Sequence, residues 1–187
     1  MQVGFGRTGS SMWAFEEHKV IPDIVVMGKP IGNGHPMAAV FTTKEIASSL
    51  GEMEFFSTFG GNPVSCSIGM AVLDVIEDEK LIENARIMGE LFIQGFNELK
   101  EQYQIIGDVR GKGLFLGIEL VKDRETLEPA VEEAQLLIEG MLSKNILLSI
   151  DGPRKNVIKI KPPMVISRED VLRTIQSMDE ILDTMCN

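Results

Sequence analysis

Lys29 is the residue of this 187-residue sequence whose surroundings are most suggestive of chemistry. It follows a short apolar run at residues 24–27, which is rich in β-branched side chains and predicts a buried β-strand. Gly28 and Pro30 flank the lysine and should end the strand in a stiff turn. Because burial disfavours the ammonium form, a lysine on an apolar floor can become a neutral amine, which a Schiff base to a carbonyl cofactor requires. The same residues also suit an ordinary loop lysine.

A second candidate site is a loop that contains hydroxyl groups. Residues 55–63 read Phe-Phe-Ser-Thr-Phe-Gly-Gly-Asn-Pro. Asn62 is a good N-cap and Pro63 suits the first helical position, so this loop should lead into a helix. The Thr58 hydroxyl lies beside the Gly-Gly turn, where it could bind a phosphate. It could equally satisfy the backbone of its own loop.

Residues 4–9 form a literal Gly-x-Gly-x-x-Gly pattern. As a dinucleotide fingerprint, such a pattern follows a strand and opens a helix. Only three residues precede it here, which favours a flexible turn followed by a short helix at about residues 11–18, anchored by Trp13 and Phe15. A nucleotide-dependent oxidoreductase remains an alternative, and a cofactor titration would separate it from the other hypotheses.

The elements that must position these residues alternate between strands and helices, which predicts an α/β protein. We expect strands at residues 37–41, 146–150 and 157–160, and a strand, glycine bend and strand over residues 105–120. We expect helices after Thr43, over residues 63–77 and 79–103, from Pro129, and after a capping box of Ser167 and Asp170.

The composition excludes several classes of protein. A net charge of −10 and a pI near 4.7 argue against binding to a nucleic-acid backbone. No apolar run reaches the length of a membrane span, and the first residues lack the character of a signal peptide. Cys66 and Cys186 lie far apart and have no metal-site spacing, so no metal is expected. Reduced thiols in an intracellular protein are the default expectation, with cytoplasm and mitochondrion both open.

Residues 27–36, which read Met-Gly-Lys-Pro-Ile-Gly-Asn-Gly-His-Pro, resemble the cofactor-lysine segment of class III, or omega-type, aminotransferases. The resemblance is strongest to the branch of ethanolamine-phosphate and phosphohydroxylysine phospho-lyases, also called alanine–glyoxylate aminotransferase 2-like. It implies that Lys29 forms an aldimine with pyridoxal 5'-phosphate and later moves a substrate proton. It also implies a fold-type-I α/β large domain, of which residues 1–78 are the C-terminal part, a linking helix at 79–103, and a small α+β domain at 104–187.

The resemblance assigns two further cofactor contacts. Gln2 matches a glutamine that reaches the hydroxyl of the cofactor ring. Thr58 matches the family's Ser-Thr-x-Gly-Gly-Asn-Pro motif, which implies that it holds the cofactor phosphate of a neighbouring subunit in a homodimer. The family's aspartate for the ring nitrogen would lie before Met1, so the chain resembles a C-terminal fragment of a family enzyme. We therefore expect that these residues alone do not form a complete active site.

The resemblance also bears on the reaction through Lys159. Typical class III aminotransferases have an arginine at this point before Pro-Pro, which clamps a substrate carboxylate. A lysine supplies a point charge without the planar fork. This difference favours elimination of phosphate from a small phosphorylated amine, with Lys159 as a substrate contact. Transamination of the alanine–glyoxylate type, a non-catalytic dimerisation protein, and a Lys159 that only lines the solvent face of a strand all remain open.

Overall fold

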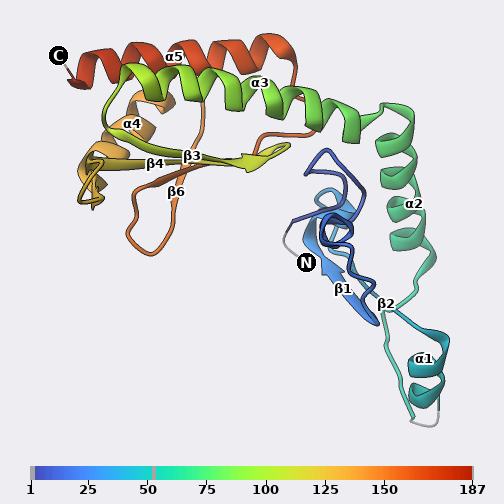
Figure 1. Ribbon diagram of the computed structural model, residues 1–187. Coiled ribbons are helices and arrows are strands. Elements are labelled where there is room, and N and C mark those ends of the chain that lie inside the picture. The colour runs from blue at the N-terminus through green and yellow to red at the C-terminus, as the bar shows by residue number, and fades with distance from the viewer. Residues whose placement is uncertain (1–2, 52–53, 187) are drawn as a thin grey trace.

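A computed structural model describes residues 3–51 and 54–186 of the chain. The N-terminal part, residues 3–78, holds a two-stranded sheet, and the C-terminal part, residues 81–186, holds a larger sheet under three helices (Figure 1). The elements of the N-terminal part are the 3-10 helix η1 (Ala14–His18), β1 (Ile24–Gly28), the 3-10 helix η2 (Lys29–Gly32), β2 (Ala38–Thr42), α1 (Lys44–Leu50) and α2 (Pro63–Asp78). Those of the C-terminal part are α3 (Leu81–Gln102), β3 (Ile106–Lys112), β4 (Phe115–Asp123), β5 (Glu128–Pro129), α4 (Val131–Ser143), β6 (Ser149–Asp151), β7 (Val157–Ile160) and α5 (Arg168–Cys186).

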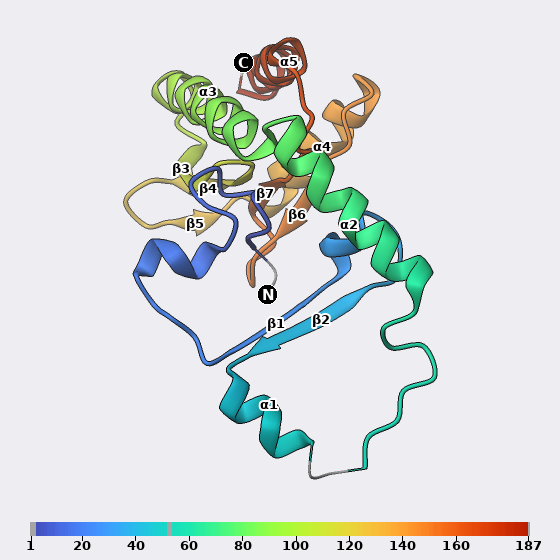
Figure 2. The same cartoon turned by 90° about the vertical axis from the view of Figure 1, so that its right-hand side faces the viewer.

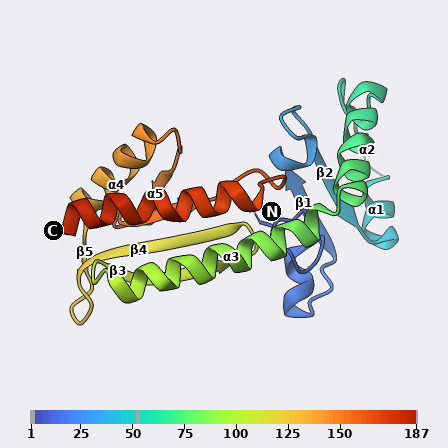
Figure 3. The same cartoon turned by 90° about the horizontal axis from the view of Figure 1, so that it is seen from above.

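The C-terminal sheet is antiparallel and has the strand order β3-β4-β7-β6, with β5 paired to β4. Helices α3, α4 and α5 all lie on one face of it (Figures 1 and 3). The side chains of β4 alternate accordingly: Leu116, Ile118 and Leu120 are buried, whereas Gly117 and Glu119 are half-exposed on the other face. The predicted strand, glycine bend and strand over residues 105–120 is therefore confirmed.

The long amphipathic helix predicted at residues 79–103 is α3. Its buried side chains recur every three or four residues, as in Ala85, Met88, Phe92, Phe96 and Leu99. The rings of Phe92 and Phe96 stack with their centroids 5.2 Å apart at the centre of the core. None of the helices in the described ranges is long and apolar enough to cross a membrane.

The strand predicted at residues 24–27 is confirmed as β1, but its expected burial on both faces is wrong. Met27 is 4% exposed, whereas Ile24 and Val26 are 53% and 58% exposed. Within the described ranges β1 pairs only with β2, and its inner face packs on a small cluster that includes Met27, Ile31 and Ile76. Among the described residues no second layer covers the outer face, so side chains on one face of β1 are buried or half-buried and those on the other are exposed.

Two further predictions need correction in the C-terminal part. Pro129 does not open a helix, because it pairs with Val121 in the short strand β5, and α4 begins two residues later. The strand expected at residues 146–150 covers Ser149–Asp151 instead.

The capping prediction for Thr43 is confirmed, because its side chain accepts a hydrogen bond from Ile46 N at the start of α1. Helix α1 and the loop that follows it extend away from the larger sheet (Figures 1 and 2).

A hydrogen bond between α3 and α5 gives this core a pH dependence. Tyr103 Oη donates to Asp179 Oδ1 over 2.7 Å, and this carboxylate raises the pKa of Tyr103 from 10.0 to about 12. Because the pKa is higher in the folded state, the bond's stabilisation is complete below about pH 10 and is lost as the pH rises toward 12. Tyr103→Phe should therefore lower the free energy of unfolding at about pH 8, with a difference from wild type that shrinks above pH 10. Urea titrations across this range would measure it, and a difference independent of pH would contradict it.

Candidate functional site

Lys29 lies where β1 ends and η2 begins. Met27 and Ile31, on either side of it, are buried and anchor the turn. Lys29 itself has a φ of 54°, in the left-handed region, which costs a non-glycine residue about 1–3 kcal/mol. Such strain persists where the surroundings enforce it, and it is concentrated at functional sites. The Lys29 side chain is exposed in this structure, so the burial that the sequence suggested for it is not found.

The turn after Lys29 is tied to helix α2. His35 Nε2 and Ser65 Oγ lie 2.8 Å apart, which joins the turn to the first turn of the helix. Gly69 of α2 leaves room for Met37, whose Cε would lie 2.6 Å from a Cβ at that glycine. The sequence did not suggest either contact, because each joins residues about thirty positions apart. Together they fix the position of the lysine-bearing turn against α2.

Thr58 lies in the exposed loop before α2. As predicted, Asn62 caps the helix: its Oδ1 accepts a hydrogen bond from Ser65 N over 2.9 Å, and its side-chain amide donates to Phe59 O over 2.8 Å. Ser57 Oγ accepts a hydrogen bond from Gly60 N, so it satisfies the loop backbone. Thr58 is different, since no hydrogen bond to its hydroxyl is found within residues 3–51 and 54–186. This hydroxyl is available to a ligand just before a helix N-terminus, which favours anions.

The Asn62 cap should contribute measurably to stability. Asn62→Ala removes the acceptor for Ser65 N, and loss of such a cap costs about 1 kcal/mol of unfolding free energy. Asn97→Ala is the control, because the exposed Asn97 caps no helix and its amide donates to Ile93 O within α3. Thermal and urea unfolding would measure both variants. Equal destabilisation of the two would contradict the capping role.

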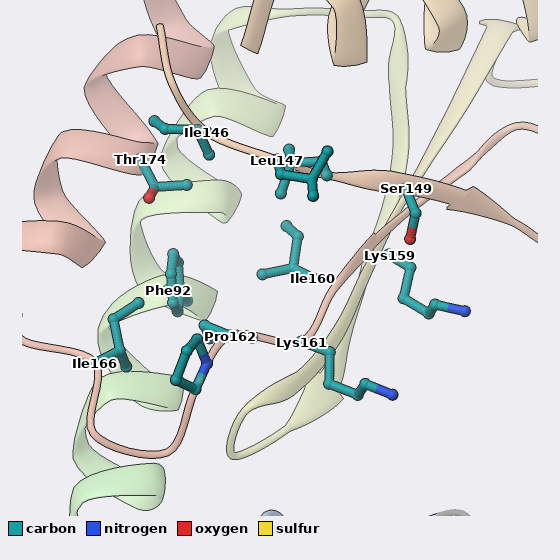
Figure 4. Close-up of a pocket in the computed structure, with 12 residues that line it drawn as sticks. Phe92, Ile146, Leu147, Ser149, Lys159, Ile160, Lys161, Pro162, Ile166 and Thr174 are labelled. Atoms are coloured by element: carbon teal, nitrogen blue, oxygen red, sulfur yellow. The ribbon is translucent and has the colours of Figure 1, made fainter. Parts of the chain in front are cut away.

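Lys159 lies on β7 and pairs with Asp151 on the neighbouring edge strand β6. The pKa of Asp151 is lowered, mainly because Lys159 donates to it and secondarily because Gly152 N donates to it. In Figure 4, Lys159 of β7 and Lys161, which directly follows β7, extend to the same side of the chain, while Ile160 points the other way. The expectation that Lys159 lies on the outward side of a strand fits this arrangement, but its ion pair was not anticipated.

A cavity of about 490 Å³ lies beside this lysine pair. Apolar side chains form much of its lining, including Phe92, Ile146, Ile160 and Pro162. In Figure 4 the ammonium groups of Lys159 and Lys161 point away from the rings and alkyl groups of these residues. Lys159 and Lys161 also line the cavity, but their ammonium groups point away from its apolar wall.

The structure does not bring the candidate residues into direct contact. Within the part of the chain that it describes, no hydrogen bond or ion pair joins Lys29, Thr58 and Lys159. Gln2 lies outside the described residues. The chain thus presents a strained amine, an available hydroxyl and a paired ammonium group on three separate segments.

The glycine pattern at residues 4–9 does not form a nucleotide cradle. A Cβ at Gly6 would lie 2.9 Å from the Ile82 side chain, and one at Gly9 would lie 2.6 Å from the backbone of Arg86. Helix α3 therefore occupies the space that a pyrophosphate would need. The expected short helix after this loop is the five-residue η1, which begins at Ala14 rather than at about residue 11.

Comparisons with known proteins agree with the motifs. The family model "Aminotransferase class-III" matches residues 1–182. The chain is 51% identical over 173 residues to alanine–glyoxylate aminotransferase 2-like from Drosophila melanogaster, which covers 91% of this chain and 35% of that protein. It is 46% identical over 189 residues to ethanolamine-phosphate phospho-lyase homolog 1 from Caenorhabditis elegans, which covers 99% of this chain and 40% of that protein.

A solved structure shares the fold closely. It is a phospholyase from Arthrobacter in complex with phosphoethanolamine, with a TM-score of 0.94 and 40% sequence identity. The match covers 98% of this chain and 44% of that one. The chain thus spans less than half the length of these relatives, over the segments that carry the lysine turn, the Thr58 loop and the three-helix sheet. This chain belongs to the class III aminotransferase family.

Proposed function

We propose that this protein acts as a pyridoxal-phosphate-dependent phospho-lyase, which eliminates phosphate from a small phosphorylated amine. The observation that carries the proposal is the strained, accessible Lys29 amine at the end of β1 in a chain of this family. Lys159 favours the lyase branch, because its ammonium is a point charge that suits a phosphate and cannot clamp a carboxylate through two parallel bonds.

The available donors fit pyridoxal phosphate, which has an aldehyde and a phosphate. Lys29 offers a primary amine for the aldehyde, and its side chain is exposed. Thr58 offers a hydroxyl for the phosphate, followed closely by the first N–H groups of α2. Gln2 would contact the ring.

Each residue then has a separate task. When bound, the cofactor supplies an electron sink for the substrate carbon that loses its proton. Lys29 Nζ accepts that proton as a general base. Lys159 attracts the phosphate group of the substrate while the bond between the substrate carbon and the phosphate oxygen breaks. For phosphoethanolamine the overall reaction consumes one water and yields acetaldehyde, ammonia and inorganic phosphate.

A product assay tests the proposal. The purified chain is incubated with pyridoxal phosphate, phosphoethanolamine and pyruvate, and alanine is measured together with inorganic phosphate and acetaldehyde. Equal amounts of phosphate and acetaldehyde, above a blank without protein, would support the lyase. Alanine formed from pyruvate without phosphate release would contradict the lyase and support the transaminase alternative. The absence of every product would contradict catalysis by these residues alone. It would agree with the incomplete active site expected from the sequence and favour the non-catalytic alternative.

We also propose that the active form is a homodimer in which Thr58 serves the neighbouring subunit's Lys29. The Thr58 loop carries three phenylalanines, Phe55, Phe56 and Phe59, which are 73%, 86% and 82% exposed. Exposed aromatic side chains in such a group are typical of a protein–protein interface.

Subunit mixing tests the shared site. Lys29→Ala and Thr58→Ala should each be nearly inactive alone, but a hybrid dimer has one site with both residues intact. Mixing the two proteins under conditions that allow subunit exchange should therefore restore part of the activity. A mixture as inactive as its components, despite demonstrated exchange, would contradict the action of Thr58 across subunits.

A further inference from the structure

Arg7 joins two segments of the C-terminal part that are far from it in sequence. Its Nη1 donates to Leu114 O over 3.2 Å, beside the first residue of β4, and to Pro162 O over 2.7 Å, just after β7. In return Leu114 N donates to Arg7 O over 2.9 Å. Figures 1 and 2 show the N-terminal loop lying beside the β3–β4 turn and beneath the first turns of α3.

The backbone around Arg7 is packed as closely as its side chain. Gly113, with a φ of 53°, approaches the loop so closely that a Cβ there would lie 2.5 Å from Arg7 O. Beside this contact, Lys112 Nζ pairs with Glu17 Oε2 over 2.7 Å, and Ser10 donates to the same carboxylate. The pKa of Glu17 is lowered, with the hydrogen bond from Lys112 as the main cause. The junction between the two parts therefore rests on close packing together with these polar links.

The surroundings of Arg7 are unusual for a charged group. It is half-buried, burial lowers its pKa, and no carboxylate pairs with it among the described residues. Its partners are neutral backbone carbonyls on two different segments. A planar guanidinium can present its N–H groups to two carbonyls in a fixed geometry, whereas the ammonium of lysine is a flexible point charge. Desolvation of this cation is a cost, and the two bonds across the junction offset it.

We infer that Arg7 is a positioning residue, which holds residues 159–164 of the C-terminal part in a fixed relation to the loop that follows Gln2. Without it the two parts keep the apolar contacts of Leu81, Ile82 and Met164 with the N-terminal cluster, but lose a side chain that bonds to both the β3–β4 turn and the segment after β7. The consequence for the reaction rests on the proposed function, because Lys159 lies three residues before Pro162. Arg7 would then set where the phosphate-attracting ammonium stands relative to the cofactor side of the site.

The two native cysteines provide a direct test. Cys66 in α2 and Cys186 at the end of α5 are both free and exposed, one in each part. Nitroxide labels on both, read by pulsed electron paramagnetic resonance, give the distribution of distances between the parts. We expect one narrow distribution in the wild type and a roughly twofold broader one in Arg7→Met, because loss of the two hydrogen bonds across the junction leaves the parts freer to move relative to one another. Arg7→Lys should broaden it as well.

Arg124→Lys is the matched control. Arg124 also donates only to backbone carbonyls, but all of them belong to the C-terminal part, at residues 100–106. Its replacement should lower stability without broadening the distribution. Should Arg7→Met fail to fold, Arg7→Gln removes the same cation with a smaller loss of polarity.

An unchanged width in a folded Arg7 variant, or equal broadening in Arg124→Lys, would overturn the inference. The measurement needs no cofactor and no turnover. Its outcome is therefore distinguishable from a failure of the proposed function.

Discussion

Lys29→Ala is expected to abolish the proposed phospho-lyase activity while leaving the fold intact. Removal of the amine eliminates both the proposed attachment point for the cofactor aldehyde and the proposed general base, so turnover should fall by at least about 10²–10⁴-fold. Stability should change little, because the Lys29 side chain is exposed and alanine keeps the same backbone strain. Steady-state phosphate release and urea unfolding would measure the two effects.

Lys19→Ala is the matched control for this experiment. Lys19 is also exposed and has the same φ of 54°, but it lies at the end of η1, outside the proposed site. Its replacement should leave turnover unchanged. Lys29→Gly gives a second check, because glycine relieves the left-handed strain: it should be inactive yet more stable than Lys29→Ala by about 1 kcal/mol. Retention of activity in Lys29→Ala would contradict its assigned role.

Lys159→Ala should produce the second largest loss, and the loss should depend on the substrate. A hydrogen bond between charged partners contributes about 1.5–3 kcal/mol, so kcat/KM for phosphoethanolamine should fall by about 10- to 100-fold. An amine without a phosphate should be affected much less, since it makes no such contact. Comparison of kcat/KM for the two substrates would measure the difference.

Lys122→Ala controls for the loss of a surface ion pair. Lys122 pairs with Glu128 over 3.0 Å on the neighbouring strand, much as Lys159 pairs with Asp151, but it lies beside β5. Surface pairs of this kind contribute little to stability, so Lys122→Ala should resemble the wild type in both assays. If Lys159→Ala reduced the activity on both amines equally, a specific contact with phosphate would be contradicted.

Local features of the structure could be predicted from the sequence because their physics is local. Thr43, Asn62 and Ser167 were identified as helix caps, and each makes the expected bond within three residues. The strand before Lys29 was identified from its β-branched side chains, and the long helix α3 from its apolar periodicity.

Features that depend on distant partners could not be predicted. The strand β1 was expected to be buried, but burial requires a second layer, and the described residues place none above Ile24 and Val26. Pro129 fits the start of a helix by local preference, yet pairing with Val121 of β4 overrides that preference.

The same limit applied to the candidate site. Asp151, the partner of Lys159, lies eight positions away, and Pro162, a partner of Arg7, lies 155 positions away. No local sequence pattern could therefore predict either contact. Lys29 could be identified from the sequence as a candidate site residue, because Gly28 and Pro30 beside it cause the turn on which it lies. Its exposure depends on what surrounds the turn in space, which local spacing does not specify.

The most direct measurement is to map where the cofactor attaches. The protein is mixed with pyridoxal phosphate, reduced with borohydride and digested, and each lysine-containing peptide is analysed by mass spectrometry. Since several other lysines, including Lys19 and Lys44, are also exposed, chemical reactivity alone would label many of them. If Lys29 lies in a selective cofactor site, the pyridoxyl group should be found on Lys29 at low cofactor concentration and on none of the other lysines. Labelling spread evenly over the exposed lysines, or absent from Lys29, would contradict the proposed site.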